Sequence, residues 1–133
     1  MSQTPHGNSA VYWQQNVLII KPSGIFNLEG IRHVAQKVNQ CIEQRPKGKW
    51  ARCVVFEDTT TIGPMDSLPL VVEQYKKSKE IGCIAVFSTG GSALNQHNMR
   101  EVCEGAEMPY EHHPSLESAI VAAEALLQSQ TDT

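Results

Sequence analysis

Two aspartates, Asp58 and Asp66, flank a threonine-rich segment and are the first residues to consider for chemistry. Neighbouring carboxylates can act as a general acid and a general base. Their spacing does not force these two together, so we interpret Asp58 as a solvated loop residue and Asp66 as a helix cap. The chain has no GxSxG elbow and no cysteine suitably placed beside a histidine, so no nucleophilic site is predicted. We expect a protein that is not an enzyme.

A second polar segment, Ser88-Thr89-Gly90-Gly91-Ser92, places two glycines before a helical pattern. Glycines in such a loop let the backbone approach a phosphate closely. The spacing matches neither GxGxxG nor GxxxxGKS, the patterns of phosphate-binding loops. We predict a turn that needs positive φ angles, and no cofactor.

Histidines and cysteines are the remaining candidates for a metal site. His112 and His113 follow Glu111, but adjacent residues of a strand point to opposite faces, so we interpret both as exposed loop histidines. The cysteines form no CxxC pair, lie in apolar segments and are predicted to be buried free thiols: Cys41, Cys53, Cys83 and Cys103. No metal site is predicted.

Charge and composition exclude several classes of partner. The chain has 11 Lys and Arg against 14 Asp and Glu, a net charge of −3, with no basic stripe that would bind nucleic acid. The longest apolar run, Val17 to Ile20, is far too short to span a membrane, and the N-terminus lacks a secretion signal. We therefore expect a cytoplasmic protein. Its 133 residues, 41% of them hydrophobic, are suited to one folded domain.

The first half of the chain reads as a hairpin, a helix and a strand. Val11–Gln14 and Val17–Lys21 are predicted strands joined by a turn at Gln15-Asn16. An amphipathic helix capped by Asn27 follows and ends before Pro46. The nearly continuous apolar run Ala51–Phe56 predicts a strand buried on both faces.

The second half repeats the alternation of helix and strand. Asp66 or Ser67 is predicted to cap a second helix that Gly82 stops, and a buried strand follows at Cys83–Phe87. The later elements are a helix through Met99 to Ala106, an edge strand at Met108–Glu111 and a helix from about Ser115.

This order predicts an α/β fold with a mixed sheet of about five strands and four helices. An N-terminal antiparallel hairpin is followed by parallel β-α-β crossovers. We predict a disordered tail at residues 1–9, a single domain at 10–128 and a C-terminal tail at 129–133.

Loops that lead into helices gather at the carboxyl ends of parallel strands, and ligands or partners bind there. Three segments qualify: 23–27, 58–67 and 88–92. The candidate binding residues in these segments are Asn27, Asp58, Thr59, Thr60, Asp66, Ser67, Ser88, Thr89, Gly90 and Gly91.

The chain resembles the STAS domain of bacterial anti-sigma factor antagonists, and most closely its SpoIIAA-like, STAS/SEC14-type branch. The resemblance covers about residues 11–127. It rests on a buried strand ending in an acid, Val54–Asp58, a threonine-rich turn, a helix from Leu68 to Lys79 and the Pro114–Ala119 opening of the last helix. Gly24–Asn27 before the first helix completes the pattern.

This resemblance implies a regulatory or protein-interaction module. The serine of the family's Asp-Ser-Ser-Gly motif is phosphorylated, and Asp66-Ser67 lies at the matching position, which makes Ser67 a candidate phosphorylation site. A regulatory kinase or an anti-sigma-like protein is the implied partner. A homodimer is left open.

An alternative function, implied by the SEC14-like relatives, is the binding of a lipid or other small apolar ligand. Such a ligand would occupy a pocket between the sheet and the helices. Its expected lining is aromatic: Trp13, Phe26, Phe56 and Phe87.

Overall fold

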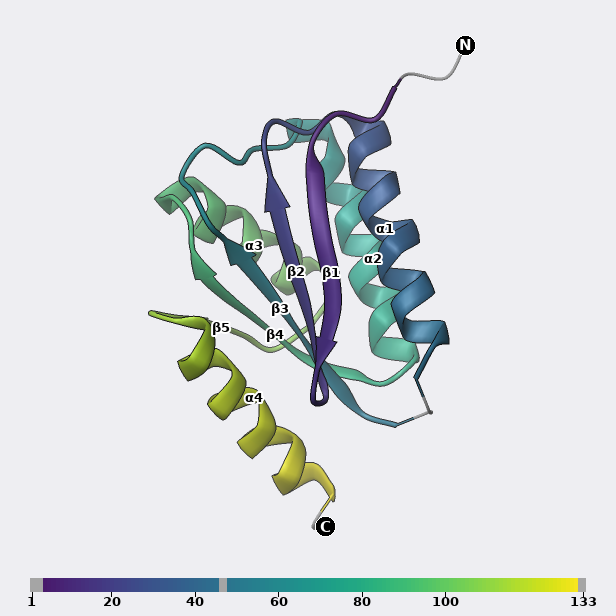
Figure 1. The fold of residues 1–133 in the computed structure, drawn as a ribbon, viewed down its shortest axis with the longest axis vertical. Helices are drawn as coiled ribbons and strands as arrows, with labels where there is room; N and C mark the ends of the chain where they lie inside the picture. The colour runs from purple at the N-terminus through teal and green to yellow at the C-terminus, as the bar shows by residue number, and fades with distance from the viewer. Residues whose placement is uncertain (1–3, 46–47, 132–133) are drawn as a thin grey trace.

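The computed structural model of the chain describes residues 4–45 and 48–131 (Figure 1). The strands are β1 (Asn8–Gln14), β2 (Val17–Ser23), β3 (Trp50–Phe56), β4 (Cys83–Gly90) and β5 (Tyr110–His113). The helices are α1 (Leu28–Glu43), α2 (Leu68–Glu80), α3 (Ala93–Gly105) and α4 (Leu116–Thr131). A short 3-10 turn, Met65–Ser67, leads into α2.

All five strands form one sheet in the order β1-β2-β3-β4-β5. β1 and β2 are antiparallel, and each later strand is parallel to its predecessor. Crossovers between parallel strands are right-handed, so an order that never reverses must place α1, α2 and α3 on the same face. α4 follows the last strand and lies apart from them on the other face (Figure 1). The predicted mixed α/β sheet with four helices is confirmed.

Alternating side chains of the sheet fill two hydrophobic cores. Leu18, Trp50 and Val54 belong to the core beneath α1, α2 and α3. Ile19 and Cys53 belong to the second core, which α4 covers. Because β3 is buried on both faces, nearly every residue of the strand is apolar, as its sequence indicated.

Several element boundaries differ from the prediction. β4 continues to Gly90, past its predicted end at Phe87. β5 begins at Tyr110, and its parallel partner is β4. Both differences arise because parallel pairing supplies hydrogen bonds to polar residues that the apolar pattern alone assigns to loops.

The ends of the described chain also differ from the predicted tails. β1 begins at Asn8, and Thr4 and His6 form hydrogen bonds with Asn27, so residues 4–9 are in contact with the domain. α4 includes residues 129–131. The remainder of the two predicted tails, residues 1–3 and 132–133, lies outside the described residues. Within the described ranges, every helix is too short or too polar to cross a membrane.

Candidate functional site

Three segments far apart in sequence meet at the carboxyl edge of the parallel strands. Ile25 and Ile62 form a parallel β-bridge, and the Phe26 amide donates to the Ile62 carbonyl at 2.8 Å. The Asn95 Nδ2 atom donates to the Thr61 carbonyl at 2.9 Å. We call this edge, residues 23–27, 57–67 and 90–95, the rim. The predicted meeting of the three loops is confirmed.

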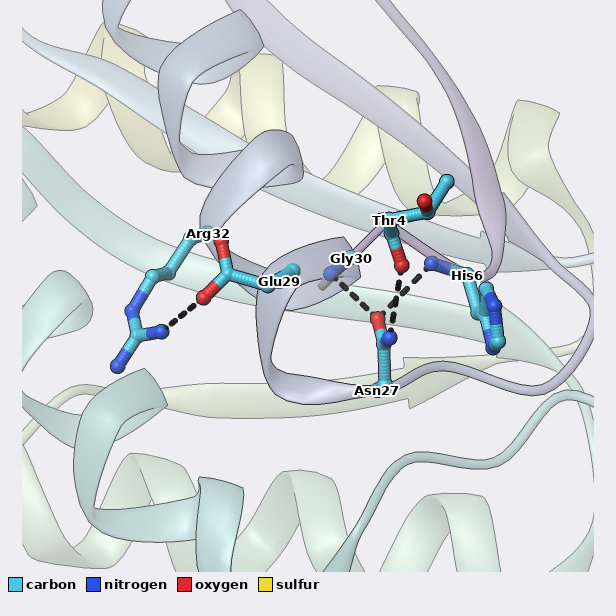
Figure 2. A network of polar contacts seen from close by, with 6 residues as sticks. All are labelled: Thr4, His6, Asn27, Glu29, Gly30 and Arg32. Atoms are coloured by element: carbon cyan, nitrogen blue, oxygen red, sulfur yellow. Dashed lines mark hydrogen bonds and ion pairs between the residues drawn. The ribbon is translucent and has the colours of Figure 1, made fainter. Parts of the chain in front are cut away.

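Asn27 was a candidate binding residue, and the structure uses its side chain within the fold (Figure 2). Its Oδ1 accepts from the backbone amides of Gly30 and His6, both at 2.8 Å. Its Nδ2 donates to the Thr4 carbonyl at 3.0 Å. The predicted N-cap of α1 is confirmed, and the same side chain also holds the segment that precedes β1.

Asp58 likewise organises its own loop. Its Oδ1 accepts from the amide and hydroxyl of Thr60, both at 2.9 Å, and from those of Thr61, at 3.1 and 3.2 Å. These hydrogen bonds, led by the Thr60 amide, lower the pKa of the exposed Asp58 carboxyl. This geometry is an Asx turn. Thr59, between them, is exposed.

Asp66 and Ser67 form part of the turn that precedes α2. Asp66 is exposed, but Ser67 is only 3% exposed and its hydroxyl donates to the Pro64 carbonyl at 2.6 Å. Ser67 occupies the predicted N-cap position of α2, but within the described residues its side chain makes no capping hydrogen bond. The 3-10 turn runs directly into α2, so Ser67 has helical φ and ψ angles and its hydroxyl bonds backward.

Ser88 and Thr89 are buried strand residues, so the prediction that they lie in a loop is wrong. They pair with Val54 and Val55 of β3. The Ser88 hydroxyl lies 2.5 Å from the Tyr110 hydroxyl and 2.9 Å from Nδ1 of His112. A serine beside a histidine could suggest a nucleophile, but Ser88 has no exposed surface through which a substrate could reach it.

Gly90 and Gly91 form the predicted turn with positive φ angles, 70° and 82°. At Gly90 a side chain is also excluded by contact, since a Cβ atom would lie 2.2 Å from the Phe56 carbonyl oxygen. These glycines let the end of β4 lie close beside the end of β3. This close approach accounts for two glycines at these positions without a bound phosphate.

His112 and His113 belong to β5 and are half-buried, which corrects their interpretation as exposed loop residues. As predicted for neighbours on a strand, they lie on opposite faces: His112 contacts Ser88, and Nδ1 of His113 lies 2.8 Å from the Ser118 hydroxyl of α4. No group of three potential metal ligands occurs among the described residues. The four cysteines are free, and only Cys41 is more than slightly exposed.

Asn95, which the sequence analysis missed, connects two parts of the rim. Its Oδ1 accepts from the amide and hydroxyl of Ser92, at 2.9 and 3.0 Å, and its amide group reaches Thr61. The Ser92 hydroxyl in turn accepts from the Asn95 amide at 3.1 Å, which completes a capping box at the start of α3. The Ser-x-x-Asn spacing was a signal that could have identified the cap.

A cavity of about 170 Å³ lies between the sheet and α1, α2 and α3. Phe26 and Phe56 line it as expected for an apolar pocket, but Trp13 and Phe87 do not. Phe87 belongs to the opposite core, and Trp13 packs edge-to-face on Trp50. The lining comprises residues 20, 22, 26, 31, 34, 52, 54, 56, 61–64, 67, 68, 71, 74, 75, 95, 98, 99 and 102.

Arg52 is the charged residue of this cavity, and the sequence analysis did not single it out. It is a lone cation in the apolar strand β3, and that contrast was the available signal.

Comparison with solved structures identifies the architecture. An anti-sigma factor antagonist from Mycobacterium paratuberculosis superposes with a TM-score of 0.59 at 16% identity, covering 90% of this chain and 95% of that one. An uncharacterised protein of the DUF3478 family from Shewanella loihica PV-4, described as having a SpoIIAA-like fold, gives a TM-score of 0.61 at 12% identity, with coverages of 92% and 98%. The chain has the SpoIIAA-like fold. No protein-family model matches the sequence, and no curated protein matches it either. At these identities the likeness concerns the fold.

Proposed function

We propose that this chain is a non-enzymatic regulatory module that binds a partner protein through the rim. One observation carries the proposal. Among the described residues, six large hydrophobic side chains are exposed, and three of them lie on the rim, each on a different segment: Ile25, Ile62 and Leu94. Exposed apolar side chains that converge in this way are typical of protein interaction sites.

The surroundings of these side chains suit a regulated contact. Thr59 and Asp66 are exposed on the same rim and provide polar groups around the apolar ones. One structural neighbour is described as an anti-sigma factor antagonist. We propose by analogy that the partner is a regulatory kinase or an anti-sigma-like protein in the cytoplasm.

The test compares three single substitutions to glutamate in the full chain. Ile25→Glu and Leu94→Glu place a charge on the rim, where the side chains are 71% and 45% exposed. Val121→Glu is the control, because Val121 is also 71% exposed but lies on α4. Each tagged variant is expressed in the native host, and captured proteins are quantified by mass spectrometry.

We expect one protein to be captured by the unsubstituted chain and by Val121→Glu but lost with both rim variants. Hydrogen exchange of the purified pair should then show protection at residues 24–27 and 60–67. Capture that survives both rim substitutions, or protection confined to α4, contradicts the proposal. Equal melting temperatures of the variants exclude unfolding as the cause.

Ser67 is the proposed modification site of this module. Its hydroxyl is buried and bonded to Pro64, so a kinase can reach it only when the turn 64–67 opens. A phosphate there would add about two negative charges beside Asp66 and keep the turn open. Intact mass of the chain recovered from its host under varied growth conditions tests this, and an unmodified mass in every condition rejects it.

We propose a second function because of the cavity: the binding of a small, mostly apolar ligand. Its volume of about 170 Å³ is comparable to the roughly 150 Å³ apolar cavity that binds benzene in an engineered protein. Phe26, Leu68 and Val71 give it an apolar wall. Native mass spectrometry after gentle purification tests whether a ligand is retained; absence of any adduct, together with no thermal shift on adding apolar compounds, counts against this function.

A further inference from the structure

The cavity beneath α1, α2 and α3 contains a buried positive charge that has no negatively charged partner among the residues that the structure describes. Arg52 is 4% exposed and lines the cavity, on the face of β3 that also carries Val54 and Phe56. Within residues 4–45 and 48–131, no Asp or Glu forms an ion pair with it. Arginine stays protonated in proteins, so this charge is permanent.

The described side chains that contact the Arg52 guanidinium are neutral. Its Nη2 donates to the Ser78 hydroxyl at 2.5 Å, and its guanidinium carbon lies 4.5 Å from the centroid of the Tyr75 ring. Burial raises the pKa of the Tyr75 hydroxyl and of the Cys83 and Cys103 thiols, so none of them supplies a negative charge at neutral pH. The aromatic ring offsets only part of the cost of burying a cation.

Part of the guanidinium is also without a hydrogen bond. The Arg52 Nε atom is buried and has no acceptor among the described residues. An unsatisfied donor on a buried charged group is costly. The guanidinium fork matches the two oxygens of a carboxylate, which would supply both the missing acceptor and the missing charge.

The rest of the cavity favours a different kind of group. From Arg52 to the rim its wall is mostly aliphatic and aromatic, including Phe26, Leu68 and Val71. Arg52 and Phe56 lie four positions apart along β3, a distance of roughly 13 Å at about 3.3 Å per residue. A ligand that satisfies the whole cavity therefore has an anionic end and a short apolar body.

We infer that the cavity binds a small amphiphilic carboxylate, with its anionic group at Arg52 and its apolar body directed toward the rim. This inference rests on the second function proposed above and names the class of ligand. Extended octanoate is about as long as the path from Arg52 to the rim, which makes it a suitable probe.

In the first experiment, the full, unsubstituted chain is titrated with three probes of equal length, and calorimetry measures the affinity for each probe. Octanoate carries the negative charge, octan-1-ol carries none, and octylamine carries a positive charge at neutral pH. We expect octanoate to bind at least about tenfold more tightly than octan-1-ol, the factor that one hydrogen bond to a charged group supplies. Octylamine should bind most weakly.

Substitutions then assign this preference to Arg52. Arg52→Met keeps the length and apolar contacts of the side chain, and it should reduce octanoate affinity to that of octan-1-ol. Arg45→Met is the matched control, because Arg45 stacks on Trp13, 4.4 Å from the ring centroid and outside the cavity. It should leave octanoate affinity unchanged.

A measurement on the unsubstituted chain keeps the inference testable even if Arg52→Met does not fold. The Arg52 Nε–H resonance should shift during octanoate titration, and that of Arg45 should not. Equal affinity for octanoate and octan-1-ol overturns this inference but leaves apolar-ligand binding intact. Failure of both probes to bind overturns the two together, and neither result affects the proposed binding of a protein at the rim.

Discussion

Replacing Asn95 with alanine should separate the stability of the rim from that of the rest of the domain. Asn95 is 6% exposed, and its side chain joins the start of α3 to the loop between β3 and α2. Alanine removes both connections without adding volume or charge. Two backbone groups, the Thr61 carbonyl and the Ser92 amide, then lose the hydrogen bonds that the Asn95 side chain makes with them.

The expected cost follows from these two groups. A buried polar group that loses its hydrogen bond costs about 1–3 kcal/mol, and the Thr61 carbonyl lies in a buried residue. The Ser92 amide is nearer the surface, where water replaces part of the lost bond. Alanine recovers about 0.5 kcal/mol through its higher helix propensity. We therefore expect a net loss of about 2–3 kcal/mol in the free energy of unfolding.

Asn98→Ala is the matched control. Asn98 lies on the same helix and is half-buried, but its side chain forms no hydrogen bond with the described part of the chain, so this variant should be as stable as the original chain or slightly more stable. Urea unfolding measures both variants. With an m-value of about 2 kcal/mol/M, Asn95→Ala should lower the midpoint by about 1–1.5 M.

Hydrogen exchange adds a local readout. The Phe26 amide donates to Ile62, the neighbour of Thr61, so it should exchange faster in Asn95→Ala and at an unchanged rate in Asn98→Ala. If both variants show the same midpoint and the same Phe26 exchange rate, the reasoning that Asn95 holds the rim together is refuted.

Two further predictions concern the turn after β4 and the edge strand. Gly90→Ala should destabilise the chain by about 3 kcal/mol or more in thermal unfolding, because a Cβ atom would lie 2.2 Å from the Phe56 carbonyl oxygen. Gly24→Ala is the control: Gly24 also has a positive φ, but its added Cβ atom would lie 3.9 Å from the nearest atom, so the loss should be only about 1–2 kcal/mol. Equal losses in the two variants would show that the contact with Phe56 does not matter. Burial, followed by the charges of Arg100 and His113, lowers the pKa of His112 below its ordinary value of 6.5. The unfolded chain therefore takes up this proton first, so stability should be full above pH 6.5 and fall as the pH drops below it. Denaturant titrations across this range should show a smaller fall for His112→Gln, and an identical profile would contradict the assignment.

Local patterns in the sequence were sufficient for most of the fold. The change from β-type to helical periodicity after Ser23 and again after Phe56 predicted the alternation of strands and helices. Asn27 as the cap of α1 and Gly82 as the end of α2 were also correct. These features depend on side chains acting on their immediate neighbours, which is why a single sequence reveals them.

The candidate site was predicted less completely, since its residues have roles that depend on distant partners. Ser88 and Thr89 are polar residues beside two glycines, a composition typical of loops, but pairing with β3 and β5 places them inside the sheet. His112 is half-buried because Ser88 lies on the neighbouring strand. Ser67 resembled a cap, and its hydroxyl bonds backward to Pro64 because the chain enters α2 through a 3-10 turn.

By itself, the sequence determined that the chain is a mixed α/β domain and that three loops must converge at one edge of its sheet, because parallel strands place their carboxyl ends together. Only the tertiary structure decided what those loops are made of: Ile25 and Ile62 side by side, Asn95 bonded to Thr61, and Arg52 buried beneath them. The physical reason is that burial and hydrogen bonding between distant segments are properties of the packed chain. No local pattern in the sequence shows whether a charged side chain in an apolar strand will form an ion pair in the folded chain.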